Sequence, residues 1–152
     1  MSTKGIRISD LKENKCIPLR EILAEIPNAS QPNWALLWLD VTPLDSSGSF
    51  FIELENKVNK SKNGFPCTFE TLFEISKKIF QEIEVLIIGC SNKGNIHRYK
   101  DDQKMYETCD IVIEMIDGGF WEIFSKDTKW IDRLAKKYEK VELLTPDFQK
   151  EH

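Results

Sequence analysis

Apolar side chains in this chain gather in short runs of the kind that form buried β-strands. Such runs occupy residues 34–42, 83–90, 110–117, 120–125 and 141–144. The run at 34–42 (WALLWLDVT) is mostly apolar at both odd and even positions, which is typical of a strand covered on both faces. The tripeptide Asp117-Gly118-Gly119 separates two of the runs and predicts a tight hairpin turn.

Four other segments repeat apolar side chains every three or four residues, as amphipathic helices do. They lie at 19–26, 50–60, 68–80 and 127–139, and Thr68 is a suitable N-cap for the third. The segment 50–60 also fits a strand through Phe50, Ile52 and Leu54. The helical pattern, however, extends to Val58 and stops before Asn63-Gly64, so we favour a helix there.

The remaining stretches are polar. Residues 1–15 carry no strong pattern and are expected to be loosely held, and residues 91–108 are expected to be irregular, with a short helix near Lys104 as the alternative. A strand at 34–42, a helical connection and a strand at 83–90 suggest a right-handed parallel crossover. We therefore predict one α/β (mixed α+β) domain over 1–152, with a mixed sheet of about five strands and helices packed on it.

Composition and charge narrow the range of partners. The 152 residues suit one domain, with 41% hydrophobic and 30% charged residues. The net charge is −4 with no basic stripe, which argues against nucleic acid and suits a basic protein as partner. The polar N-terminus lacks a secretory pattern, and no apolar run approaches the roughly 18 residues that span a membrane. We expect a cytoplasmic protein with no membrane partner.

The four cysteines, Cys16, Cys67, Cys90 and Cys109, are far apart in sequence and mostly flank apolar runs. They form no Cys-x-x-Cys pair, and the chain has only two histidines. We expect free thiols, no structural metal and no cofactor.

Cys90 stands where a catalytic cysteine or a phosphate-binding loop is often found, at the end of a strand. Its spacing to Arg98 is Cys-x7-Arg, however, whereas cysteine phosphatases use Cys-x5-Arg. Gly89 and Gly94 have the spacing of a phosphate-binding loop but lack the Lys and Ser or Thr that should follow. A Cys90–His97 nucleophile is the alternative that would make this chain a small hydrolase.

Carboxylates interrupt the apolar runs, which is costly unless they are solvated, paired or functional. They are Asp40, Asp110, Glu114, Asp117 and Glu122. Glu55-Asn56-Lys57 with Asp45 upstream resembles the acid…Glu-x-Lys core of restriction-type nucleases, which implies magnesium held by the acids. We interpret these residues instead as an exposed acidic sheet face and a charged helix, with a metal-dependent nuclease as the alternative.

Tryptophan is abundant for a chain of this length, with four residues. Trp34 and Trp38 fall on the same face of a strand and are expected in the core. Trp121 adjoins the hairpin turn and is expected to contact a partner. The expected binding residues are Trp121, Asp101, Asp102, Asp117, His97 and Arg98.

We therefore predict a non-catalytic protein-interaction module, and immunity- or antitoxin-like binding of a basic partner is the specific form of this prediction. The alternative is a small hydrolase or metal-dependent nuclease. An enzyme requires a pocket where the named polar groups converge, whereas a binding module requires an acidic and aromatic surface patch.

Overall fold

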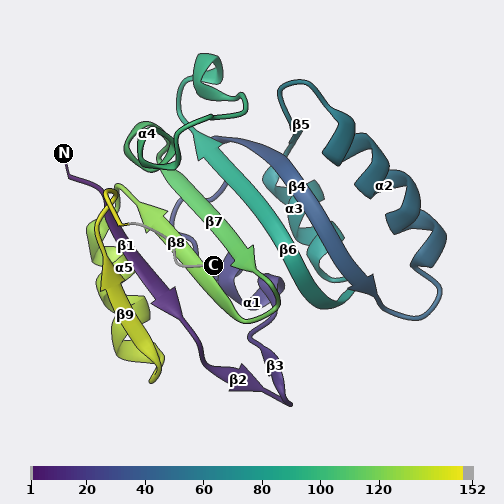
Figure 1. The fold of residues 1–152 in the computed structure, drawn as a ribbon, viewed down its shortest axis with the longest axis horizontal. Coiled ribbons are helices and arrows are strands. Elements are labelled where there is room, and N and C mark those ends of the chain that lie inside the picture. The colour runs from purple at the N-terminus through teal and green to yellow at the C-terminus, as the bar shows by residue number, and fades with distance from the viewer. Residues whose placement is uncertain (1, 149–152) are drawn as a thin grey trace.

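The computed structural model describes residues 2–148, and its centre is a seven-stranded sheet (Figure 1). All neighbouring strands are antiparallel. Across the sheet the order is β5 (Phe65–Cys67), β4 (Asn33–Pro43), β6 (Ile79–Cys90), β7 (Ile111–Ile116), β8 (Phe120–Ser125), β1 (Lys4–Ile8) and β9 (Val141–Leu144). A small hairpin of β2 (Leu11–Lys12) and β3 (Lys15–Cys16) follows β1.

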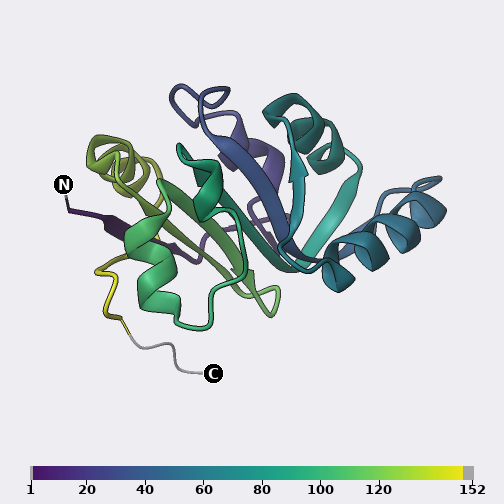
Figure 2. The same cartoon turned by 90° about the horizontal axis from the view of Figure 1, so that it is seen from above.

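Helices cover the two faces of the sheet unequally. They are α1 (Leu19–Leu23), α2 (Gly48–Lys60), α3 (Phe69–Ser76), α4 (Asp102–Thr108) and α5 (Thr128–Lys137). Figure 2 shows α1, α3 and α5 on one side of the sheet and α4 on the other. The larger core lies under α1, α2, α3 and α5, and a smaller one lies under α4. None of the helices in residues 2–148 is both long and apolar enough to cross a membrane.

The mixed α+β character is confirmed, but the sheet is antiparallel and has seven strands, so the prediction of about five strands in a mixed sheet is wrong in detail. The predicted parallel crossover is wrong because the chain travels the length of the sheet twice between β4 and β6. It passes along α2, pairs briefly with β4 as β5, and returns along α3, so that Ile79 of β6 pairs opposite Pro43. Two passages reverse the direction that a single helix would have preserved.

Helix α3 ends at Ser76, four residues before the predicted boundary at residue 80. Ile79 is the first residue of β6 and not part of the helix, and its side chain is buried there. One apolar residue between a helix and a strand satisfies both periodicities, so the pattern alone placed it in the wrong element. The helices expected at 50–60 and 127–139 are confirmed as α2 and α5.

Residues 4–8 form strand β1 of the sheet, although residues 1–15 were expected to be loosely held; residue 1 lies outside the described residues. Strand β1 lies between β8 and β9, and Ile6 and Ile8 are fully buried. On the opposite face of the strand, Arg7 donates two hydrogen bonds to Glu122, at 2.8 and 3.1 Å. Only two apolar residues face the core, too few to form a pattern in the sequence, and the other face is held by an ion pair 115 residues away.

A β-bulge in β4 changes which side chains reach the core. Leu36 pairs with Ile87 and Trp38 with Leu86, so Leu37 is an extra residue in the ladder. Before the bulge Trp34 and Leu36 point to the larger core, and after it Leu39 does. Trp38 therefore emerges on the other face with 41% of its surface exposed, so the expectation that both Trp34 and Trp38 are buried is wrong for Trp38.

Strand β5 pairs only with residues 34–36 of β4. Further along the outer edge of β4, side chains of α2 bind the backbone polar groups that another strand would otherwise bind. The amide of Asn59 accepts from the Leu39 N–H and donates to the Leu39 carbonyl, both at 2.9 Å. Glu55 accepts from the Val41 N–H at 2.8 Å. An unpaired edge is an aggregation hazard, and these contacts satisfy its polar groups from within the chain.

We expect Asn59→Ala to lower the free energy of unfolding by about 1–3 kcal/mol, because it leaves both polar groups of Leu39 without their partner. Asn56→Ala is the matched control, since Asn56 is exposed on the same helix and the change in helix propensity is identical. Urea unfolding of both variants measures the difference. Equal stability of the two would show that the edge contact contributes nothing.

Candidate functional site

The segment 91–108, expected to be irregular, is largely ordered. It contains a 3-10 turn at Lys93–Asn95 and the helix α4, so the alternative of a short helix near Lys104 is confirmed. Asp101 is the N-cap of α4 and accepts from the Gln103 N–H at 3.0 Å, and Asp102 lies in the first turn. The expected binding residues Asp101 and Asp102 thus begin a helix, where acidic side chains are favoured by its dipole.

Arg98 is hydrogen-bonded to distant parts of the fold, whereas the contacts of the half-buried His97 are with its neighbours in sequence. Arg98 donates to the carbonyls of Leu37 at 2.6 Å, Val58 at 2.9 Å and Ser61 at 3.0 Å. It therefore joins the bulge of β4 to the C-terminal end of α2. The His97 ring is 4.1 Å from the Tyr99 ring, centroid to centroid, and its Nδ1 is 2.9 Å from the Arg98 carbonyl oxygen.

Trp121 is fully buried, and its indole N–H donates to the Ile17 carbonyl at 2.7 Å. The expectation that it contacts a partner is therefore wrong: its place beside a turn did not expose it, because β8 is covered by the larger core. Asp117 lies in the β7–β8 turn with φ of 51°, followed by Gly118 at 64°, which confirms the tight hairpin.

The expected binding residues come from two segments, the 91–108 connection and the hairpin turn, which lie at opposite ends of β7. Segment 91–108 leads into Ile111, whereas the hairpin turn follows Ile116. Six residues of extended chain separate them by about 20 Å. An antiparallel connection and the next hairpin necessarily fall at opposite ends of the strand that they share.

The arrangement around Cys90 does not favour a nucleophile. The thiol is buried and points to the Asn95 carbonyl oxygen at 3.7 Å. A hydrogen bond with Cys109, together with burial, raises the pKa of Cys90, so the reactive thiolate is disfavoured. No contact between Cys90 and His97 exists among the hydrogen bonds of residues 2–148. All four cysteines are free thiols.

The residues resembling a nuclease core are also engaged differently. Glu55 lies on α2 and holds the edge of β4 through Val41, as described above. Within residues 2–148, no group of three or more His, Cys, Asp and Glu side chains has a geometry that could hold a metal ion.

Carboxylates do gather on the face of the sheet that carries α4, beyond the end of that helix. Asp40 pairs with Glu84 across β4 and β6, and Leu86 pairs with both Trp38 and Glu114. The lower parts of β4, β6 and β7 have no helix in front of them in Figure 1. We call the group Trp38, Asp40, Glu84, Glu114 and Asp117 the acidic face.

The charges of the acidic face are close enough to disturb one another. A hydrogen bond with Asp117 is the main cause that raises the pKa of Glu84, followed by its partial burial and the negative charges of Asp117, Asp40 and Glu114. Among the ion pairs of residues 2–148, none involves Asp40, Glu84 or Asp117. Glu122, one strand further, differs in being buried and paired with Arg7.

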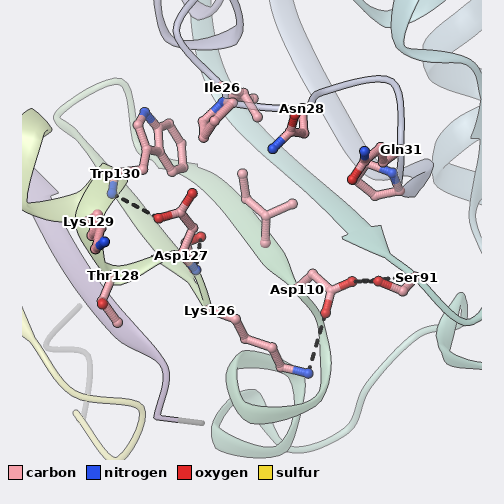
Figure 3. Close-up of a pocket in the computed structure, with 14 residues that line it drawn as sticks. Ile26, Asn28, Gln31, Ser91, Asp110, Lys126, Asp127, Thr128, Lys129 and Trp130 are labelled. Carbon is pink, nitrogen blue, oxygen red and sulfur yellow. Dashed lines mark hydrogen bonds and ion pairs between the residues drawn. The ribbon is translucent and has the colours of Figure 1, made fainter.

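A pocket of about 520 Å³ lies at the opposite end of β7, and we call it the strand-end pocket (Figure 3). Its walls come from the ends of β6 and β8, the starts of β7 and α5, and the loop that leads from α1 to β4. Asp110 accepts from the N–H of Ser91 at 2.6 Å and from its hydroxyl, and pairs with Lys126 at 3.4 Å. Although burial opposes it, these contacts hold the pKa of Asp110 below its usual range.

No protein-family model, curated protein or solved structure matches this chain. Function is therefore argued from the acidic face and the strand-end pocket themselves. Sequence reasoning selected Asp40, Glu114 and Asp117 as carboxylates of interest but missed the exposure of Trp38, because residues 34–39 are all apolar and the bulge leaves no mark in such a run. It also missed the pocket, whose walls come from four separate parts of the chain.

Trp121→Ala should lower the free energy of unfolding by about 3–5 kcal/mol, the usual cost of deleting a buried tryptophan. Trp38→Ala, the same substitution at an exposed position, should cost much less. Denaturant unfolding followed by circular dichroism compares the two. A small effect of Trp121→Ala would contradict its placement in the core.

Glu84→Gln should raise the melting temperature at pH 7. Because the folded-state pKa of Glu84 is raised above its unfolded value, the folded protein binds the proton more readily. This group therefore destabilises the fold above the raised pKa, and the penalty disappears as the pH falls to about 4. Thermal unfolding across that range should show the advantage of Glu84→Gln shrinking with falling pH, and a constant or growing advantage would argue against the proposed repulsion.

Proposed function

We propose that this chain is a non-catalytic protein-binding module whose acidic face docks against a basic surface of another protein. The observation that carries the proposal is the exposed Trp38 on the same sheet face as Asp40 and Glu84, with Asp117 hydrogen-bonded to Glu84; these three carboxylates form no ion pair with a basic side chain among residues 2–148. An immunity- or antitoxin-like role, in which the partner is a basic protein, is the specific form of this proposal.

The physical support is that the acidic face is unfavourable in the isolated chain. The pKa of Glu84 is raised chiefly by its hydrogen bond with Asp117, and further by the repulsion of its charge by Asp117, Asp40 and Glu114. Lys or Arg side chains from a partner would relieve that repulsion and would also be steered toward the face before contact. Trp38, at 41% exposure, offers a large rigid side chain of the type that dominates binding energy at protein interfaces.

Other partners and activities receive less support. Phosphate groups of a nucleic acid would be repelled by the same carboxylates. A hydrolase using Cys90 and His97 would need an accessible thiolate, and the Cys90 thiol is buried with a raised pKa. We therefore do not propose a catalytic role.

The test is affinity purification of the tagged chain from its own cells, followed by quantitative mass spectrometry. We expect one basic protein to be retained by the unaltered chain and lost at high salt. Asp40→Lys/Glu84→Lys and, separately, Trp38→Ala should each reduce its recovery by about tenfold, which corresponds to about 1.4 kcal/mol of binding energy.

The matched control is Glu53→Lys/Glu70→Lys, which changes the net charge equally at exposed positions on α2 and α3. Recovery of the partner should be unchanged in this control. Equal loss in both double variants would indicate a general charge effect, and retention by the Asp40→Lys/Glu84→Lys chain would reject the acidic face as the binding surface.

A further inference from the structure

The strand-end pocket is separate from the acidic face and has a different chemistry. Amide side chains of Asn28 and Gln31 approach from the loop before β4, and the carboxylates of Asp110 and Asp127 approach from the strand ends (Figure 3). The lining also includes apolar residues, of which Ile26, Pro27 and Pro32 are half-buried and Ile111 is buried. The pocket thus combines a polar rim with an apolar floor.

Both walls of the pocket are held in place before any ligand arrives. The loop before β4 is anchored by the Trp34 indole N–H, which donates to the Ala29 carbonyl at 2.7 Å, and by the Gln31 N–H, which donates to the Asn28 carbonyl at 3.0 Å. Asn28 itself has φ of 54°, a left-handed conformation that is unusual outside glycine.

The charges of the pocket cancel. Asp110 and Asp127 are matched by Lys126 and Lys129, and Asp110 is already paired with Lys126. One carboxylate oxygen of Asp127 accepts a hydrogen bond from the backbone N–H of Trp130 at the start of α5. A charged ligand would have to displace these contacts or face a group of its own sign, so a neutral ligand is favoured.

The amides of Asn28 and Gln31 are available to a ligand. Neither side chain takes part in the hydrogen bonds found within residues 2–148, although each can donate two and accept two. A group that meets amide donors on one wall and carboxylate acceptors on the other must both accept and donate. Hydroxyl groups do both without a change of protonation state.

We propose that the strand-end pocket binds an uncharged, polyhydroxylated ring, such as a monosaccharide or cyclitol. The hydroxyl groups meet Asn28, Gln31 and Asp127 at the rim, and one C–H face of the ring lies against the half-buried apolar lining of Ile26, Pro27 and Pro32. The volume of about 520 Å³ is within the range of about 300–1,000 Å³ for small-ligand pockets. A nucleobase fits less well, because the only aromatic residue in the lining, Trp130, is buried and offers almost no face for stacking.

Saturation-transfer NMR with the full chain tests this proposal. The probes are glucose, N-acetylglucosamine and myo-inositol, with adenosine and sulfate as representatives of the excluded classes. We expect at least one of the three neutral polyols to bind saturably and adenosine and sulfate not to bind. Binding only by adenosine or sulfate, or by none of the five, would overturn the proposal.

The variants locate the binding. Asn28→Gly removes the amide and keeps the left-handed backbone unstrained, and Gln31→Ala removes the second amide. Each should weaken polyol binding by about tenfold, a loss of the size expected for one hydrogen bond. Asn14→Gly is the control, since Asn14 also has a left-handed backbone, with φ of 66°, but lies in the β2–β3 turn. Polyol binding that is unaffected by both pocket variants, or equally weakened by Asn14→Gly, would place the site elsewhere.

Discussion

The β-bulge at Leu37 decides which side chains of this protein reach the surface. It reverses the alternation of β4, so that Leu39 continues the larger core while Trp38 and Asp40 turn to the face that carries α4. Arg98 holds the bulge by donating to the Leu37 carbonyl, and its other donors reach Val58 and the end of α2. The acidic face therefore depends on a backbone irregularity that is maintained by a residue 61 positions away.

Among residues 2–148, the two carboxylates that are buried, Glu82 and Glu122, both have partners. Glu122 is paired with Arg7, and Glu82 accepts from the Leu19 N–H at the start of α1. Asp40, Glu84 and Asp117 of the acidic face are exposed and form no ion pair within residues 2–148, and the pKa of Glu84 is raised by its hydrogen bond with Asp117 and by the neighbouring negative charges. A local arrangement that lowers the stability of the isolated fold is typical of a functional surface, where binding of a partner can offset the cost.

The antiparallel sheet also explains why the two proposed sites lie apart on one small domain. Each long connection falls at the end of the sheet opposite to the next hairpin, so the strand-end pocket and the β7–β8 turn are separated by the length of β7. One end collects loops that converge on Ile111 and form a pocket, and the other leaves a nearly bare sheet surface around Glu84. The proposed small ligand and the proposed protein partner would therefore bind independently.

The sequence by itself determined the elements whose patterns are local: α2, α5, the strands β7 and β8, and the tight turn at Asp117-Gly118 between them. Periodicity and turn chemistry act within a few residues, so one chain segment contains the whole signal. Only the tertiary structure decided the direction of β6, the order of β1 in the sheet, the burial of Trp121 and the exposure of Trp38. Each of these depends on partners distant in sequence, such as Arg7 with Glu122 or Leu37 with Arg98, and no local pattern records them.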